Sequence, residues 1–138
     1  MSQEPLYAIG AFRAVGGLSA WLTPNLLARV YGGDEPDRDA LLWSRLAGSR
    51  ELALAIGPVL SEGGERRRWL MLGLACDFAD MIATLIGNRR NHRLSAHSAS
   101  LALATYSVSA LLTMRAIKAA GSAYGAHLPA LEAAGLRE

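Results

Sequence analysis

The sequence lacks features that are typical of several common classes of protein. It holds a single cysteine, Cys76, which excludes an intrachain disulfide and any CxxC site. Charged residues make up only 19% of its 138 residues, against roughly 25% in an average soluble domain. The net charge of +2 is too small to indicate nucleic-acid binding, and no basic patch is interleaved with aromatic residues. We therefore expect no nucleic-acid partner. Because no phosphate-binding glycine pattern is present we predict no nucleotide site, and we expect no cofactor.

The sequence is instead rich in apolar residues, which are grouped into long segments. Hydrophobic residues make up 51% of the chain, and the longest run without Asp, Glu, Lys or Arg, from Leu94 to Met114, has the length of about 20 residues that a spanning helix needs. Short polar links divide the sequence into apolar segments, which we predict to be helices at about 6–31, 40–60, 69–87 and 96–117. Short links force neighbouring helices to run antiparallel.

The predicted fold is therefore an all-α, antiparallel four-helix transmembrane bundle with up-down-up-down topology. It occupies residues 1–120, and residues 121–138 form a C-terminal tail without a spanning segment. Trp69 directly follows three arginines, and Tyr31 and Trp43 flank the first link, as expected of side chains at membrane interfaces. These features favour a multi-pass protein of the cell membrane. The alternative is a soluble four-helix bundle with unusually apolar helices.

Ionisable residues lie well inside these apolar segments. Counting about 1.5 Å per residue along each predicted helix brings five of them within roughly 6 Å of one level; they are Arg13, Arg50, Glu51, Asp77 and Asp80. Tyr106 of the last helix reaches the same level. A charged side chain facing lipid costs about 2.5 to 3.5 kcal/mol, so five would cost over roughly 10 kcal/mol, comparable to the stability of a whole domain. We expect them to face inward and neutralise one another.

Pairing follows from the position of each residue. We expect Arg13 to bind Asp77 or Glu51, and Arg50 to bind the remaining acids. Arg50 and Glu51 are adjacent, so their side chains leave the helix about 100° apart, and we do not expect these two to pair with each other. Three acids against two arginines leave one carboxyl in excess, which we expect to be protonated because burial favours the neutral form.

Two interpretations of this charged layer remain open. It is either a clasp that only sets the register of the helices, or a functional site, as ionisable groups inside a membrane commonly are. In the second interpretation Asp77, Asp80 and Glu51 are the candidate catalytic residues, and Arg13, Arg50 and Tyr106 the candidate substrate-binding residues. A metal held by the two aspartates is disfavoured because the nearest candidate histidine begins the last helix on the opposite side.

A site with apolar walls favours a lipophilic ligand, such as an isoprenoid-like or quinone-like molecule. Paired carboxyl groups suit acid–base chemistry, so an isomerase, a cyclase or an epoxide-opening enzyme is one possible function. A non-catalytic accessory subunit of a larger membrane complex, or a small transporter, is the alternative. The expected partners are the lipid bilayer and a lipophilic small molecule, with a homo-oligomer or a larger membrane complex left open.

Three short segments resemble a known family. They are the Arg-x-x-Gly-Gly of Arg13, Gly16 and Gly17, the RLAGSREL of Arg45 to Leu52, and the DFAD of Asp77 to Asp80. Together they resemble the DoxX-like group of small four-helix integral membrane proteins, which are mostly bacterial, over residues 6–117. The resemblance implies a four-helix bundle with a polar centre in a bacterial cell membrane. It transfers no catalytic residue, because members are described variously as oxidoreductase-associated subunits or as orphans.

Overall fold

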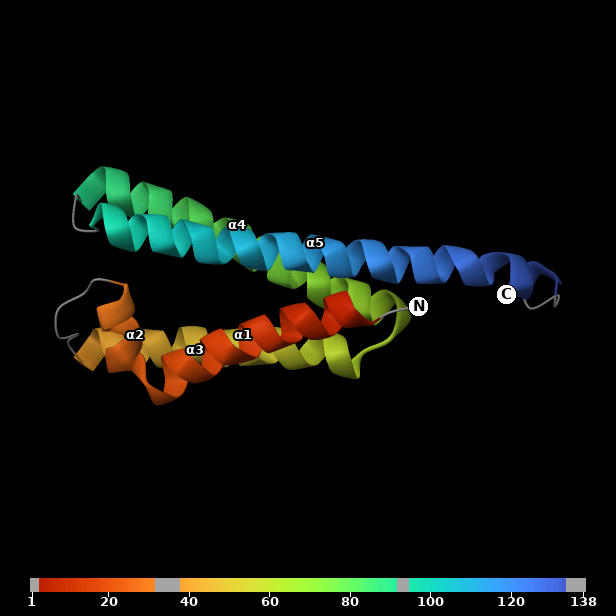
Figure 1. Cartoon of the computed structure of the whole chain (residues 1–138), viewed down its shortest axis with the longest axis horizontal. Coiled ribbons are helices and arrows are strands. Elements are labelled where there is room, and N and C mark those ends of the chain that lie inside the picture. The colour runs from red at the N-terminus through yellow and green to blue at the C-terminus, as the bar shows by residue number, and fades with distance from the viewer. Residues whose placement is uncertain (1–2, 32–37, 92–94, 134–138) are drawn as a thin grey trace.

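The chain is built of helices. The computed structural model describes residues 3–31, 38–91 and 95–133, and among these it contains no strand. The helices run in the order α1 (Glu4–Leu22), α2 (Pro24–Val30), α3 (Arg38–Leu60), α4 (Gly63–Asn91) and α5 (Ala96–Ala133) (Figure 1). The all-α prediction is confirmed, but the described part of the chain forms five helices where four were predicted.

The additional helix arises because the first predicted helix is broken at Pro24. Thr23, the residue before the proline, has φ −130° and ψ 51°, outside the helical region. Proline disfavours helical conformation in the residue before it and has no N–H to continue the hydrogen-bond ladder. The predicted helix at 6–31 is therefore two helices, α1 and the short α2.

Two other helices are longer than predicted. α4 begins at Gly63, whose φ of +51° is readily adopted by glycine, where the prediction began the helix at Trp69. α5 continues to Ala133, where the prediction ended it at 117. The sequence beyond 117 is rich in alanine, the best helix former. Of the predicted tail, residues 134–138 lie outside the described residues.

The closest packing joins α1 to α3, and a pair of glycines makes it possible. A Cβ added to Gly17 would lie 2.8 Å from the carbonyl oxygen of Gly48, and one added to Gly48 would lie 2.7 Å from the carbonyl oxygen of Gly17. Further along, Gly10 faces Ala55 and Val59. Residues with lower numbers in α1 contact residues with higher numbers in α3, so the two helices run antiparallel.

The second extensive pair is α4 with α5, and it meets the first through α1 against α5 and α3 against α4. Figure 1 shows α4 leaving the end of α3 and passing to the side of α5. An apolar core at the N-terminal end of α1 joins the two pairs. Its buried members are Leu6, Ile9, Leu70 and Ala116, and Phe12 packs against them.

Two described helices are long and apolar enough to cross a membrane: residues Gly63–Gly87 of α4 and Ala96–Gly121 of α5. Only 17% of the most apolar stretch of α4, and 22% of that of α5, is buried inside the protein. Large apolar side chains are also exposed on α1 and α3, among them Trp21, Leu22, Trp43 and Ile56. The packing of this chain therefore leaves much apolar surface uncovered.

Candidate functional site

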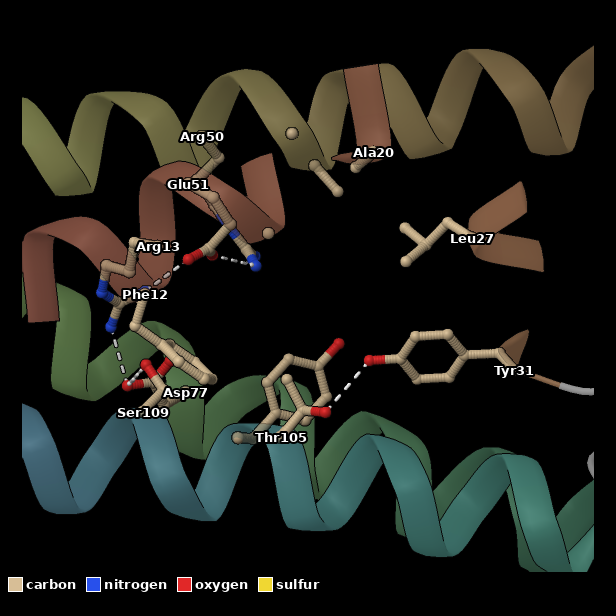
Figure 2. A pocket seen from close by; sticks show the side chains of 14 residues that line it. Phe12, Arg13, Ala20, Leu27, Tyr31, Arg50, Glu51, Asp77, Thr105 and Ser109 are labelled. Carbon is tan, nitrogen blue, oxygen red and sulfur yellow. Dashed lines mark hydrogen bonds and ion pairs between the residues drawn. The ribbon is translucent and has the colours of Figure 1, made fainter. Parts of the chain in front are cut away.

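Arg13 lies at the centre of a network of ion pairs. Its Nη1 lies 2.6 Å from Oε2 of Glu51 on α3, and its Nη2 lies 2.7 Å from Oδ2 of Asp77 on α4 (Figure 2). The side chains of Arg13 and Asp77 are each only 2% exposed. Gly73, one turn before Asp77, leaves space for the guanidinium, because a Cβ there would lie 3.0 Å from Nη2. One arginine thus ties α1 to two other helices.

The network continues through Arg50. Its guanidinium binds both oxygens of Asp80, at 3.2 Å and 2.6 Å, and its Nη2 also lies 3.0 Å from Oε1 of Glu51. Glu51 therefore bridges the two arginines. Ser109 of α5 donates a hydrogen bond of 3.0 Å to Asp77 Oδ2, so four helices contribute to one connected cluster: α1, α3, α4 and α5.

The predicted convergence of five charged residues is confirmed, and one predicted detail is wrong. Arg13 binds both of its candidate partners, and Arg50 binds Asp80 as expected. Arg50 also pairs with its neighbour Glu51, against the prediction. The Cα–Cβ bonds of adjacent helical residues diverge, but both side chains are long enough for their ends to meet.

The formal charge of the cluster does not sum to zero. Two guanidinium groups face three carboxylates, which leaves one negative charge in excess. Burial is uneven, since Asp77 is 2% exposed while the side chains of Glu51 and Asp80 are 22% and 21% exposed. One proton, or one positive charge on a bound molecule, would make the cluster neutral.

A cavity of about 190 Å³ adjoins this cluster, on the side away from the apolar core. Each of the five helices contributes to its lining. Most of the exposed wall surface is apolar; six of the lining residues are apolar or small, namely Phe12, Gly16, Ala20, Leu27, Ala47 and Gly48. Figure 2 shows Arg50, Glu51 and Asp77 along one side and Tyr31 facing Thr105 at the other end.

The polar wall at that far end has a defined hydrogen-bond direction. The Thr105 hydroxyl donates to the carbonyl oxygen of Leu101 at 2.9 Å. The Tyr31 hydroxyl lies 3.1 Å from the same Thr105 oxygen. Because a threonine hydroxyl has only one hydrogen, Tyr31 must be the donor in this pair. The remaining hydrogen-bonding capacity of the Tyr31 oxygen is as an acceptor.

The predicted site residues fall into two groups. The lining of the cavity includes Arg13, Arg50, Glu51, Asp77 and Tyr106. Asp80 is not among the lining residues, and its described contacts are with Arg50 and Thr84. Asp80 is thus placed to hold Arg50 and not to touch a molecule in the cavity.

Three contributors were missed by sequence reasoning. Ser109 and Thr105 belong to a stripe of small polar residues at helical spacing on α5, which was the available signal. Tyr31 was predicted to be an interfacial anchor, whereas it is half-buried and lines the cavity. Its position depends on the break at Pro24, which redirects the chain that carries it.

The arrangement can bind a molecule that has an apolar body and one polar group. Apolar walls would take the body, and the carboxylates and guanidinium groups along one side of the cavity would face the polar group. Each carboxylate of the cluster is already paired with a guanidinium group. Among the described residues, no group of three His, Cys, Asp or Glu could hold a metal ion. The excess carboxylate is a potential proton acceptor.

Comparison of the chain with protein-family models, with curated proteins and with solved structures finds no match.

Proposed function

We propose that this chain is a multi-pass integral membrane protein whose charged layer and adjoining cavity bind a lipophilic small molecule. The observation that carries the proposal is a cavity with mostly apolar walls that ends at an ion-pair cluster with one excess negative charge. The proposal includes a four-helix antiparallel bundle in the membrane, formed by α1, α3, α4 and α5, with the short α2 at one end. The resemblance to the DoxX-like group supports this arrangement.

Uncovered apolar surface supports the membrane part of the proposal. The core helices of a soluble protein of this size would be mostly buried, whereas the most apolar stretches of α4 and α5 are 17% and 22% buried. A soluble monomer rarely exposes large contiguous apolar patches. Lipid would cover this surface, while the ionisable residues face inward and pair, as a bilayer requires.

Acid–base chemistry on the bound molecule is the reaction class that the cluster supports. Asp77 and Glu51 line the cavity, and both are held in fixed positions by Arg13. A carboxylate with a fixed position can take a proton from a ligand or return one. The guanidinium groups can stabilise negative charge that develops on a ligand oxygen. Isomerisation, cyclisation and epoxide opening all use these steps.

Mass spectrometry of small molecules that co-purify with the protein in native nanodiscs tests the proposal. The variant Gly16→Leu adds a side chain where a Cβ meets nothing within 4 Å and where the backbone lines the cavity. We expect the wild type to retain a discrete lipophilic compound, and Gly16→Leu to lose at least about nine-tenths of it. The matched control is Gly121→Leu, at an open position outside the cavity lining.

An identical set of bulk lipids in the wild type and both variants would contradict the proposal. The charged layer would then be a clasp that holds the helices in register, and the search for function would move to protein partners. Asp77→Asn extends the test, because it removes the excess charge and leaves the shape of the cavity almost unchanged. Unaltered retention by that variant would show that the charged layer takes no part in binding.

A further inference from the structure

A second hollow lies where α1 ends and α2 begins. Thr23 leaves the helical conformation before Pro24, and a space of about 430 Å³ lies between this bend and α3. We call it the bend hollow, and its lining consists of residues 22–26, Arg29, Leu41 and Arg45. None of these residues lines the cavity beside the charged layer. The bend hollow is therefore a separate feature, at the end of the molecule where Figure 1 shows α2.

Two arginines supply the charge of the bend hollow. Arg29 of α2 and Arg45 of α3 are both exposed, and neither guanidinium group has an ion pair or a hydrogen bond to any part of the chain that the structure describes. No acidic residue is among the described residues that line it. The guanidinium groups of the charged layer are all paired, whereas this hollow carries two positive charges without a negative charge in its wall.

Exposed apolar side chains border these two arginines. Leu22 and Leu26 line the hollow and are 67% and 60% exposed, and Trp43, two residues before Arg45, is 68% exposed. Tryptophan is enriched at the level of the lipid head groups. An exposed arginine in a membrane-spanning chain lies at that level as well, because charge that faces hydrocarbon is costly. In the proposed membrane arrangement, the bend hollow therefore lies at the boundary between head groups and acyl chains.

We propose that the bend hollow binds an anionic phospholipid, with its phosphate at Arg29 and Arg45 and an acyl chain against Leu22 and Leu26. The proposal rests on the membrane part of the proposed function and not on the ligand of the cavity. A guanidinium group presents parallel N–H donors that match the oxygens of a phosphate. Basic pockets between membrane helices bind anionic head groups in this way. The volume of the hollow also falls within the range of about 300 to 1,000 Å³ that is typical of small-molecule sites.

Other occupants with a phosphate match only part of this surface. A zwitterionic phospholipid brings a cationic group to a site that already holds two unpaired arginines, and it leaves their charge unbalanced. Inorganic phosphate, or a soluble phosphate ester, balances the charge but makes no apolar contact with Leu22 and Leu26. An anionic phospholipid combines the negative charge with the apolar body.

Native mass spectrometry of the full chain in detergent micelles measures this binding. Dioleoyl phosphatidylglycerol and dioleoyl phosphatidylcholine share the same two tails and differ in the net charge of the head group. Glycerol phosphate presents the charged group without a tail. We expect the first phosphatidylglycerol to bind at least about tenfold more tightly than phosphatidylcholine. An excess of glycerol phosphate should not displace it.

Two double variants locate the site. Arg29→Gln/Arg45→Gln should weaken binding of phosphatidylglycerol at least about fivefold and leave phosphatidylcholine unchanged. The matched control is Arg67→Gln/Arg68→Gln, which removes the same two charges from exposed positions in the first turns of α4, outside the hollow. It should bind phosphatidylglycerol within about twofold of the wild type. Circular dichroism checks that both variants keep their helices.

The possible results bear differently on the two proposals. Equal binding of the two lipids, or equal losses in the two double variants, would overturn the lipid site. Displacement of the lipid by glycerol phosphate would overturn it in favour of a soluble phosphate compound. Gly16→Leu alters the cavity but not the bend hollow, because Gly16 lines only the former. This variant should bind phosphatidylglycerol as the wild type does, and loss of that binding would count against a separate site. A cavity that retains no compound, in a protein that still selects phosphatidylglycerol through Arg29 and Arg45, would contradict the proposed ligand of the cavity and support the lipid site.

Discussion

Arg13 and Asp77 form an ion pair of 2.7 Å in which both side chains are 98% shielded from solvent. The pair joins α1 to α4, two helices that have no other direct ion pair among the described residues. Ser109 of α5 adds a hydrogen bond to the same carboxylate oxygen. The charged layer therefore links the two helix pairs of the fold at the point where the cavity begins.

Breaking this pair should destabilise the protein strongly. Arg13→Met removes the guanidinium and leaves two carboxylates, Asp77 and Glu51, without their common partner. Removing one member of a buried pair costs about 3 to 5 kcal/mol, and we expect a loss of that size in detergent-based equilibrium unfolding. The double variant Arg13→Met/Asp77→Leu should be less destabilised than the sum of its single changes. Full additivity would contradict the pairing.

The two aspartates of α4 should differ in their effect on binding. Asp77 lines the cavity, whereas Asp80 acts on Arg50 from outside the lining. We expect Asp77→Asn to reduce retention of the co-purifying compound at least about tenfold, and Asp80→Asn to reduce it less. Mass spectrometry of the two variants, purified in parallel, makes the comparison. A larger effect of Asp80→Asn would require a different account of which residues face the ligand.

The contact between Gly17 and Gly48 should tolerate no larger residue. Gly17→Ala would place a Cβ 2.8 Å from the carbonyl oxygen of Gly48, so the backbones of α1 and α3 must separate. Overpacking of this kind costs about 1 to 3 kcal/mol. The adjacent Gly16→Ala meets nothing within 4 Å and should be neutral or stabilise by about 0.5 to 1 kcal/mol. Thermal unfolding midpoints that fall equally in both variants would exclude this packing.

Arg66 has a structural role in the connection between α3 and α4. Its Nε donates to the carbonyl oxygens of Pro58 and Ser61, at 3.1 Å and 2.8 Å, where the end of α3 leaves carbonyls without helical partners. We expect Arg66→Ala to lower the free energy of unfolding by about 1 kcal/mol. The exposed neighbour serves as control, since Arg67→Ala should stay within about 0.5 kcal/mol. Equal losses of stability in the two variants would show that the effect comes from removing a positive charge and not from losing the hydrogen bonds to the end of α3.

Membrane insertion has a direct biochemical test. In the proposed arrangement, lipid covers the apolar surface of α4 and α5, and such a protein stays in the membrane fraction when alkaline carbonate strips peripheral proteins. We expect the full chain to stay in the pellet after carbonate extraction and to enter solution only with detergent. Release by carbonate alone would contradict the proposed membrane-spanning arrangement.

The charged cluster could be predicted from sequence because its physics is simple. Depth along a helix follows from residue number, and the cost of an unpaired charge in an apolar segment favours pairing with a residue of opposite charge at the same depth. This reasoning placed Arg13, Glu51 and Asp77 together correctly. It failed for Arg50 with Glu51, because the direction of a Cβ does not fix the end of a long side chain.

The cavity could not be predicted in the same way. Its far end is formed by Leu27 and Tyr31, which reach it only because the chain bends at Pro24. The sequence showed the proline, but whether a proline kinks a helix or divides it depends on the packing around it. The exclusion of Asp80 from the lining likewise depends on how α4 is rotated against α3, which no periodicity in one sequence determines.

Photolabelling of the cavity tests the central claim most directly. A lipophilic probe with a diazirine in a ten-carbon tail is irradiated with the protein in nanodiscs, and the labelled residues are identified by peptide mass spectrometry. The account predicts labels on the cavity wall, at Phe12 and Leu27, and their loss in Gly16→Leu. Labels confined to outward-facing residues such as Leu22 and Leu26, and unchanged in Gly16→Leu, would show that the probe reports only the surrounding lipid and would contradict the account.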